Sequence, residues 1–212
     1  MADLSQAETP KMVATTPVIL ASASAVRARL LAAAGIAFEQ QPAAVDEGEV
    51  KNALKSEGAS AREAAEALAE LKAQHVSRKH PEAFVIGADQ ILECDGVWFD
   101  KPGARADAAA SLKALGGRDH ELIASVCVIR GGAILWHHSD RASLHVRALD
   151  EGFIERYLDA AGQAALDSVG AYQLEGLGAN LFTRIDGDYF TILGLPLLPL
   201  LDFLRGHQVG LQ

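Results

Sequence analysis

One aspartate flanked by two lysines is the most chemically suggestive combination in the sequence. Asp89 closes an apolar run that begins at residues 84–86 and is typical of a buried strand. Open α/β sheets bind ligands beyond the carboxyl ends of their strands, so we expect the Asp89 carboxylate to face a crevice. Lys72 precedes Asp89 by seventeen residues, and Lys101 follows it by twelve. This combination suggests a phosphorylated substrate, a metal ion, or both.

Several roles are open for these residues. The Asp89 carboxylate could ligate a divalent cation, act as a general base towards water, or simply cap the turn after its strand. Glu47 could be a second oxygen ligand for a hard metal such as Mg²⁺ or Mn²⁺, or an exposed acidic residue. Lys72 and Lys101 could neutralise a polyphosphate, although most lysines are solvated. Their joint occurrence around one carboxylate favours phosphate chemistry.

Two serines and an arginine lie where a predicted strand passes into a predicted helix. Residues 17–20 form the strand, and Ser22 or Ser24 can cap a helix that ends at Gly35. The free N–H groups and the dipole at a helix N-terminus favour a phosphate oxygen, serine hydroxyls can donate to it, and the Arg27 guanidinium can clamp it. The alternative is ordinary capping, with Arg27 solvated.

The elements expected in the first half of the chain position these residues. Residues 42–58 are acidic and are expected to form a loop. A capping box of Ser60 and Glu63 begins a helix that runs to about Arg78 and carries Lys72. Asp95-Gly96 predicts a β-hairpin between residues 91–94 and 97–99. Lys101 should therefore leave this hairpin near the same rim as Asp89.

The second half of the chain alternates strand and helix patterns with a glycine-rich loop. In order, we expect a helix over 104–115, strands over 121–130 and 133–138 about Gly131-Gly132, a strand over 142–148, a helix from Asp150 to Gly162, a loop over 168–178, strands over 179–185 and 189–193 about Asp186-Gly187, and a helix over 196–205. This mixture of elements indicates an α/β fold.

Composition limits the class of protein. The 212 residues are 50% hydrophobic, which fits a disordered tail over residues 1–16 and a single domain over residues 17–208. The formal net charge of −9 disfavours non-specific binding to nucleic acid. The apolar stretch over 192–204 is interrupted and too short to span a membrane, and the chain begins with no secretory signal pattern. We therefore expect a cytoplasmic protein with no membrane or nucleic-acid partner.

Eight short motifs, taken in order, resemble those of the Maf-type nucleoside triphosphate pyrophosphatases. They are Leu20-Ala-Ser-Ala-Ser, Val45-Asp-Glu47, Leu68-Ala-Glu-Leu-Lys-Ala73, Gly87-Ala-Asp-Gln90, Lys101-Pro102, Gly170-Ala-Tyr172, Glu175-Gly176 and Gly194-Leu-Pro196. The resemblance covers about residues 17–205. It implies an elongated mixed β-sheet flanked by helices, similar to inosine triphosphate pyrophosphatases, a homodimer, and a divalent metal cofactor, Mg²⁺ or Mn²⁺.

The resemblance also implies an activity and residue roles. Members cleave nucleoside triphosphates between the α and β phosphates and release pyrophosphate, which keeps non-standard nucleotides out of nucleic acids. Asp89 becomes the proton acceptor or a metal-bound carboxylate, and Glu47 joins it in holding the metal. The phosphate-binding residues become Ser22, Arg27, Lys72 and Lys101, with Ser24 beside them.

Other positions bear on the base that is recognised. The pyrimidine-preferring branch of the family tends to have Thr after the motif Asp and Gln before the loop glycine, whereas this chain has Gln90 and Glu175. These two residues resemble the branch that acts on 7-methylguanosine triphosphate. A carboxylate can accept from N1–H and the exocyclic amine of guanine together, and an acidic pocket favours a cationic methylated base. Gly170-Ala-Tyr172 is closer to the general family pattern, which leaves the base open.

A different class of function is also compatible with the resemblance. The family is associated with inhibition of septum formation, so the chain could be a non-enzymatic regulator of cell division that binds a nucleotide or a protein partner. This alternative predicts nucleotide binding without turnover. A dinucleotide-dependent oxidoreductase is disfavoured because the sequence has no glycine-rich dinucleotide fingerprint.

Overall fold

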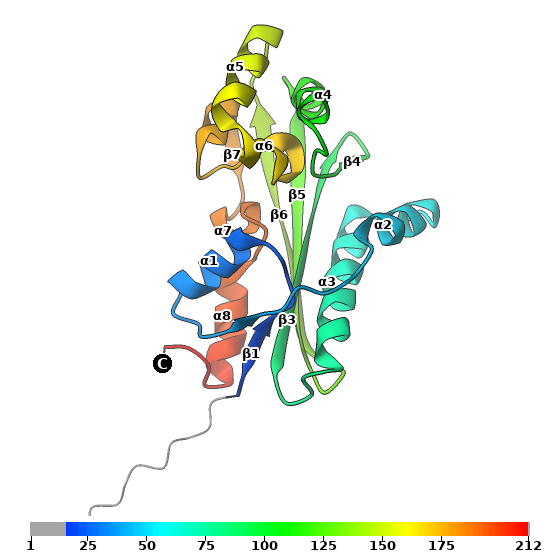
Figure 1. Ribbon diagram of the computed structural model, residues 1–212, viewed down its shortest axis with the longest axis vertical. Coiled ribbons are helices and arrows are strands. Elements are labelled where there is room, and N and C mark those ends of the chain that lie inside the picture. The colour runs from blue at the N-terminus through cyan, green and yellow to red at the C-terminus, as the bar shows by residue number, and fades with distance from the viewer. Residues whose placement is uncertain (1–15, 212) are drawn as a thin grey trace, which may run out of the picture.

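The computed structural model describes residues 16–211, so the predicted tail over residues 1–16 lies outside the described residues apart from Thr16. Its centre is a seven-stranded mixed sheet with the order β2-β1-β3-β5-β6-β7, in which β4 pairs with β3 beside this path. The strands β3, β5 and β6 are long and give the molecule its elongated shape (Figure 1). This confirms the predicted α/β class with a mixed, elongated sheet.

The elements follow one another along the chain with short connections. They are β1 (Val18–Leu20), α1 (Ala25–Ala33), β2 (Glu39–Gln40), α2 (Glu47–Ser56), α3 (Ala61–Ser77), β3 (Phe84–Cys94), β4 (Val97–Phe99), α4 (Arg105–Leu115), β5 (Asp119–Arg130), β6 (Ala133–Val146), α5 (Glu151–Ala161), α6 (Gln163–Leu166), η1 (Val169–Ala171), η2 (Leu177–Leu181), β7 (Phe182–Asp186), α7 (Tyr189–Ile192) and α8 (Leu197–Gly206). None of the helices within residues 16–211 combines the length and the apolar character that crossing a bilayer requires.

The strand expected over 179–185 begins only at Phe182, as β7, because residues 177–181 form the 3₁₀ turn η2. Two other expected strand boundaries are wrong because a single long strand is expected there as shorter pieces. The strand at residues 84–86 does not end at Asp89 but continues as β3 to Cys94. The separate strands expected over 133–138 and 142–148 are one strand, β6, which turns out to be continuous through its polar middle. Polar residues interrupt the sequence pattern in both places, but cross-strand hydrogen bonds with β5 hold the backbone extended.

Three helices were also missed: α2, α7 and the short helix α6. Residues 42–58, expected as a loop, contain α2, whose N-cap Asp46 accepts a hydrogen bond from the Glu49 amide at 3.0 Å. The strand expected over 189–193 is instead the short helix α7, capped by Asp188. The glycine-rich segment 168–178 contains the 3₁₀ turn η1 and the start of η2. In α2 and α7, a capping aspartate outweighs an ambiguous local pattern.

The two faces of the sheet are covered by different helices. Ile86 and Ala88 pack in the cluster that contains α1 and α8 residues, whereas Val85 packs in the cluster of α3. Figure 1 shows α1 and α8 on one side of β3 and α3 on the other. Because side chains alternate along a strand, Asp89 belongs to the α3 face and Gln90 to the α1 face.

One edge of β3 is left open between two short partner strands. The parallel strand β1 pairs with β3 only as far as Leu20, opposite Ile86, and β4 begins to pair only at Leu92. Within residues 16–211, no strand pairs with residues 87–91 on this edge. The gap lies beyond the carboxyl end of β1, so the expected crevice exists, although β1 rather than β3 ends there.

Candidate functional site

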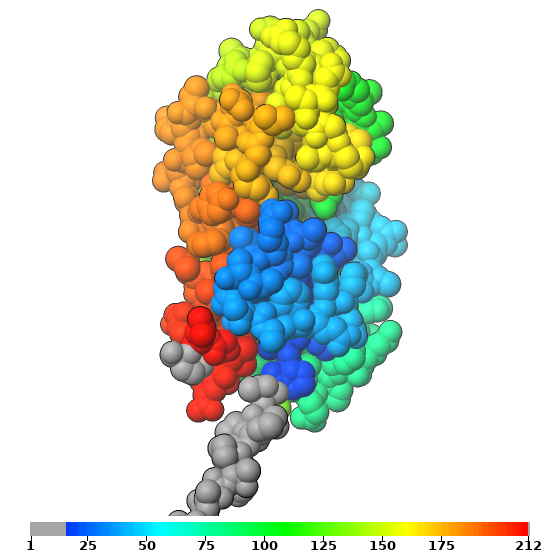
Figure 2. Space-filling model, turned by 60° about the vertical axis from the view of Figure 1, so that its left-hand side comes forward, coloured from blue at the N-terminus to red at the C-terminus, as the bar shows by residue number. Residues whose placement is uncertain are grey.

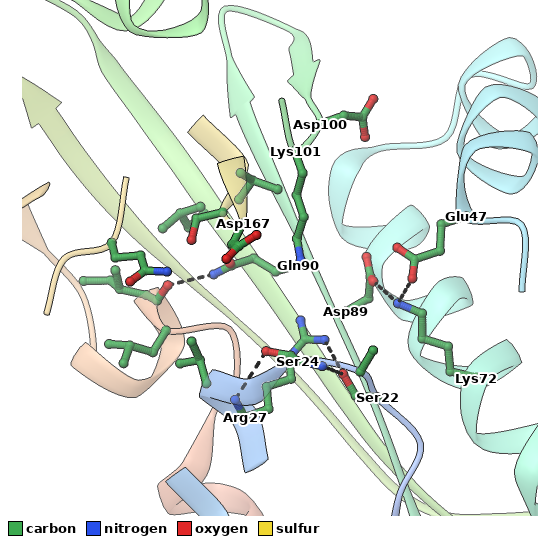
Figure 3. Close-up of a pocket in the computed structure, with 18 of the residues that line it drawn as sticks. Ser22, Ser24, Arg27, Glu47, Lys72, Asp89, Gln90, Asp100, Lys101 and Asp167 are labelled. Carbon is green, nitrogen blue, oxygen red and sulfur yellow. Dashed lines mark hydrogen bonds and ion pairs between the residues drawn. The ribbon is translucent and has the colours of Figure 1, made fainter. Parts of the chain in front are cut away.

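A cavity of about 430 Å³ occupies this gap and collects every predicted site residue. The nine residues that sequence motifs had singled out all line it: Ser22, Ser24, Arg27, Glu47, Lys72, Asp89, Gln90, Lys101 and Glu175. They come from α1, α2, α3, β3 and the connecting loops. Figure 2 shows the orange segment around residue 175 lying against the blue segment of α1, and Figure 3 shows the polar side chains converging on the cavity.

A buried ion-pair cluster forms one wall of the cavity. The Lys72 ammonium lies 2.6 Å from Asp89 Oδ1 and 2.7 Å from Glu47 Oε1. Lys72 and Asp89 are almost completely buried, whereas about half of the Glu47 side chain is exposed. The second oxygen of Asp89, Oδ2, is buried and has no hydrogen-bond partner among the described residues. A buried carboxylate oxygen without a hydrogen-bond donor lowers the stability of the fold, so a bound cation, water or other ligand at Asp89 Oδ2 would be favoured.

The pKa of Glu47 reflects this cluster. Partial burial raises the pKa of its carboxyl group. The Lys72 hydrogen bond and the charges of Lys72, Lys51 and Arg27 together lower the pKa by more than burial raises it, so the net pKa lies below the usual value. Glu47 is therefore ionised at neutral pH. It is available both to Lys72 and to a cation in the cavity.

Gly87 explains how Lys72 reaches Asp89. A Cβ atom at Gly87 would lie 2.1 Å from the backbone oxygen of Ala69 and 2.8 Å from Ala73 Cβ, both in α3. Only a glycine therefore allows α3 to pack this closely against β3. The close contact places Lys72 and Asp89, which lies two residues after Gly87 on the same face of the strand, within hydrogen-bond distance.

Arg27 lies on the floor of the cavity, and its guanidinium is already hydrogen-bonded to other groups of the protein. Its guanidinium donates to Gly194 O at 2.7 Å, to Ala88 O at 2.8 Å and to Ser22 Oγ at 3.2 Å. Burial lowers its pKa, although the nearby carboxylates of Asp89 and Glu47 oppose this shift. The alternative of a solvated Arg27 is wrong. The side chain joins α1 to the open edge of β3 and to the loop before α8.

The two serines combine capping with a place at the cavity. Ser24 is the N-cap of α1 and accepts from the Arg27 amide at 3.3 Å, as expected. Ser22 is buried, and its hydroxyl oxygen accepts from the Ser24 amide and from Arg27. The N-terminus of α1 therefore faces the cavity (Figure 3), where its dipole favours an anion.

Gln90 lies on the opposite face of β3 from Asp89 and is held by α7. Its side-chain nitrogen donates to Thr191 O and to Ile192 O, each at 3.0 Å. The Thr191 hydroxyl, which is completely buried, donates to Asp140 Oδ2 at 3.0 Å. This places α7, an element that the sequence pattern did not reveal, as the support of Gln90.

Replacing Thr191 with Val is expected to raise KM several-fold for a substrate whose recognition involves Gln90, while kcat changes little. The variant keeps the side-chain shape but loses the bond to Asp140, so the carbonyls that hold Gln90 are less well fixed. Steady-state kinetics measure the effect, and the free energy of unfolding should fall by about 1 kcal/mol. Thr183→Val, at an exposed position of β7, is the control. A loss of stability with unchanged KM would contradict this positioning role.

Glu175 and Lys101 reach the cavity from two different loops. Glu175 Oε1 lies 2.9 Å from Arg29, an exposed residue of α1, so this pair ties the segment before η2 to α1. Lys101 follows β4 and extends into the cavity towards Asp167 and Gln90 (Figure 3). The structure adds three charged lining residues that the sequence motifs had missed: Lys51, Asp100 and Asp167. Helical spacing from Glu47 would have indicated Lys51, had α2 been recognised.

A buried histidine supports the wall formed by Tyr172. His120 Nε2 lies 2.7 Å from the Tyr172 hydroxyl, and His120 Nδ1 has no hydrogen-bond partner among residues 16–211. Burial lowers the pKa of His120 to about 4, so the imidazole is neutral at physiological pH. Tyr172 lines the cavity on the side of Gln173 and Leu174.

This histidine predicts a specific loss of stability in acid. Because its folded pKa of about 4 is below the unfolded value of about 6.5, the stabilisation is complete above pH 6.5 and is lost as the pH falls towards 4. The loss should reach about 3 kcal/mol. Urea unfolding at pH 7.5 and 4.5 measures it. His120→Gln should show a smaller difference between the two pH values, whereas His137→Gln, at an exposed position, should behave as the wild type.

Comparison with known proteins places the chain in a family. The family model described as Maf-like protein matches residues 17–207. A Nitrobacter winogradskyi protein named nucleoside triphosphate pyrophosphatase is 57% identical over 192 residues, which are 90% of this chain and 94% of that protein. One from Granulibacter bethesdensis with the same name is 55% identical over 190 residues, covering 90% and 96%. A Rhizobium meliloti protein named 7-methyl-GTP pyrophosphatase is 49% identical over 187 residues, covering 88% and 94%. The chain belongs to the Maf family.

Proposed function

We propose that this chain is a nucleoside triphosphate pyrophosphatase that hydrolyses its substrate to a nucleoside monophosphate and pyrophosphate. The names of its relatives support this activity. The observation that carries the proposal is the Asp89 carboxylate, which is fixed by Lys72 through Oδ1 and has its buried Oδ2 without a partner at the cavity. Such an atom suits a proton acceptor or a cation ligand.

Asp89 and Glu47 have the donor chemistry that a divalent cation needs. Among residues 16–211 there is no cluster of three His, Cys, Asp or Glu side chains that could hold a metal. Mg²⁺, however, is commonly bound by one or two carboxylates together with substrate phosphates. The half-exposed Glu47 carboxylate would hold Mg²⁺ or Mn²⁺ in this way, and Asp89 Oδ2 would be either a second ligand or the proton acceptor, but not both in the same step. When bound, the ion would neutralise phosphate charge and make water more acidic.

Different side chains of the cavity accept the proton, neutralise the phosphate charge and keep the site rigid. Asp89 Oδ2 accepts a proton from the water that attacks the α phosphorus, while the Lys72 hydrogen bond keeps the carboxylate in one orientation. Lys101 and the N-terminus of α1 offset the negative charge on the phosphates, as phosphoryl transfer requires. Arg27 holds the floor of the cavity rigid through its bonds to Ala88 and Gly194.

The nucleoside end of the cavity is rich in hydrogen-bond acceptors, which supports 7-methyl-GTP as the preferred substrate. Two backbone carbonyls accept from the Gln90 side-chain nitrogen, so its carbonyl oxygen is the atom left for a base. Glu175 adds a carboxylate to the cavity lining. Guanine presents N1–H and an amine as neighbouring donors, whereas uracil and thymine present one donor between two acceptors. Acceptors also favour the positive charge of a 7-methylated base.

A substrate panel tests the proposal. Nucleoside triphosphates, including 7-methyl-GTP, UTP and dTTP, are incubated with Mg²⁺ or Mn²⁺, and orthophosphate and pyrophosphate are measured separately. We expect pyrophosphate release, fastest with 7-methyl-GTP. Release of orthophosphate alone would contradict cleavage between the α and β phosphates. Faster turnover of UTP or dTTP would contradict the base preference but not the reaction.

The same assay separates the enzyme from a purely regulatory protein. A non-enzymatic regulator of cell division would bind nucleotides without turnover by the wild type. For the enzyme we propose a role in the cytoplasm, where hydrolysis of non-standard or methylated nucleotides prevents their incorporation into nucleic acids. We also propose a homodimer, which light scattering of the purified protein measures directly.

A further inference from the structure

Lys51 is a positively charged residue that lines the cavity but belongs to none of the sequence motifs. It lies one helical turn after Glu47 in α2, so the two side chains project from the same face of the helix. Its side chain is 15% exposed, and its ammonium lies 2.9 Å from Asp100 Oδ1. Both residues line the cavity, so this ion pair joins α2 to the end of β4 across the cavity rim.

The cavity has few cations that are free to meet a polyphosphate. Its charged lining residues comprise four cations and five carboxylates: Arg27, Lys51, Lys72 and Lys101, with Glu47, Asp89, Asp100, Asp167 and Glu175. Lys72 is paired with two carboxylates, and Arg27 donates to two carbonyls and a hydroxyl. Lys101 and Lys51 therefore remain as the cations best able to bind a group that carries several negative charges.

The partner of Lys51 can be exchanged, unlike the partner of Lys72. Asp100 is 76% exposed, so its carboxylate stays hydrated when it leaves Lys51, whereas Asp89 is only 5% exposed. An ion pair with one well-exposed member contributes little stability, because water competes with it. A phosphate oxygen can thus replace Asp100 at the ammonium without leaving a buried charge uncompensated.

The arrangement of the site indicates which phosphates Lys51 would meet. In Figure 3, Gln90 lies on one side of Asp89 and Glu47 of α2 on the other, while Asp100 lies above Asp89. A nucleotide with its base near Gln90 and its α phosphate at Asp89 directs its remaining phosphates towards α2. We propose that Lys51 binds the β and γ phosphates, and afterwards the pyrophosphate product, by exchanging Asp100 for a phosphate oxygen. This assignment rests on the proposed pyrophosphatase function.

A purely structural role for the same ion pair makes a different prediction. No residue of α2 is buried, so its position over the cavity depends on few contacts, and the Lys51–Asp100 pair could simply hold it there. If so, removal of either partner should have the same effect. If Lys51 binds phosphate, removal of Asp100 should not weaken the site, because Asp100 competes with the ligand.

Three variants distinguish these roles: Lys51→Met, Asp100→Asn and, as the matched control, Lys55→Met. Lys55 lies one turn further along α2, over the ring of Trp98, and does not line the cavity. For each variant, KM is measured with the preferred triphosphate, and pyrophosphate binding is measured by calorimetry with Mg²⁺ present. We expect Lys51→Met to raise KM and weaken pyrophosphate binding at least tenfold, with Asp100→Asn binding pyrophosphate as tightly as the wild type or more tightly.

The results can distinguish failure of the Lys51 phosphate site from failure of the proposed pyrophosphatase activity. Equal weakening of pyrophosphate binding by Lys51→Met and Asp100→Asn, or no weakening by Lys51→Met, would overturn the role of Lys51 even if the wild type hydrolyses triphosphates. A wild type that releases no pyrophosphate, yet binds it in a Lys51-dependent manner, would instead contradict the pyrophosphatase and support the phosphate site. Lys55→Met should match the wild type in both measurements.

Discussion

Asp89→Asn is expected to lower kcat for pyrophosphate release by about 10²- to 10⁴-fold, the usual contribution of a general base. An amide has nearly the same shape and still accepts from Lys72, but it cannot take a proton from water. It is also a much weaker ligand for a divalent cation than a carboxylate. Turnover of the preferred triphosphate at saturating Mg²⁺, followed by pyrophosphate release, measures the effect.

The matched control for this substitution is Asp95→Asn. Asp95 lies in the turn between β3 and β4 with a positive φ of 50°, a conformation that Asn also tolerates, and its carboxylate is exposed. We expect wild-type turnover from this variant. Asp89→Asn should retain nucleotide binding, because the cations around the phosphates are unchanged. Undiminished turnover by Asp89→Asn would exclude Asp89 as the base.

Lys72→Met is expected to reduce both stability and activity, because it leaves the buried Asp89 carboxylate without a partner. Removal of one member of a buried ion pair typically costs about 3 to 5 kcal/mol. Lys72 and Asp89 are 7% and 5% exposed, so the pair is largely shielded from bulk water. The pKa of Glu47 should rise as well, since the hydrogen bond and charge of Lys72 lower it in the wild type. Urea unfolding and turnover measure the two effects.

A double variant tests whether the loss arises from the unpaired charge. Lys72→Met combined with Asp89→Asn removes both charges, so it should be more stable than Lys72→Met alone but remain inactive. Lys113→Met is the control, since its ion pair with Glu151 is exposed on both sides and should contribute less than about 1 kcal/mol. If the double variant were as unstable as the sum of the single variants, direct pairing of Lys72 with Asp89 would not explain the loss.

The predicted elements were most accurate where one local signal was strong. The capping box of Ser60 and Glu63 correctly began α3, and Asp95-Gly96 correctly marked the turn between β3 and β4. The errors fell where tertiary contacts decide the conformation. β3 continues through the polar pair at residues 89–90 because β5 pairs with it from Val85 to Glu93. The apolar residues of α7 suggested a strand, but the Asp188 cap and the bond from Thr191 to Asp140 favour a helix there.

The structure brings the predicted site residues together in one cavity, but with a geometry that differs in part from the one expected. Asp89 was expected at the end of its own strand, whereas the cavity exists because β1 stops opposite Ile86 and leaves the edge of β3 open. Lys51 was missed because residues 42–58 were expected to form a loop, so its helical spacing from Glu47 was not considered. Strand ends and helix faces depend on neighbours that are distant in sequence.

The sequence by itself determined the family, the α/β class and nine of the side chains that line the cavity, because these depend on residue types in order along the chain. Only the tertiary structure decided which of these side chains pair with one another and which are held by other elements. Alternation along β3 directs Asp89 to Lys72 and Gln90 to α7, and the close packing at Gly87 brings α3 within reach. Which charges are paired, and which can still be exchanged for a phosphate, follows from burial, a property that arises only when distant segments pack together.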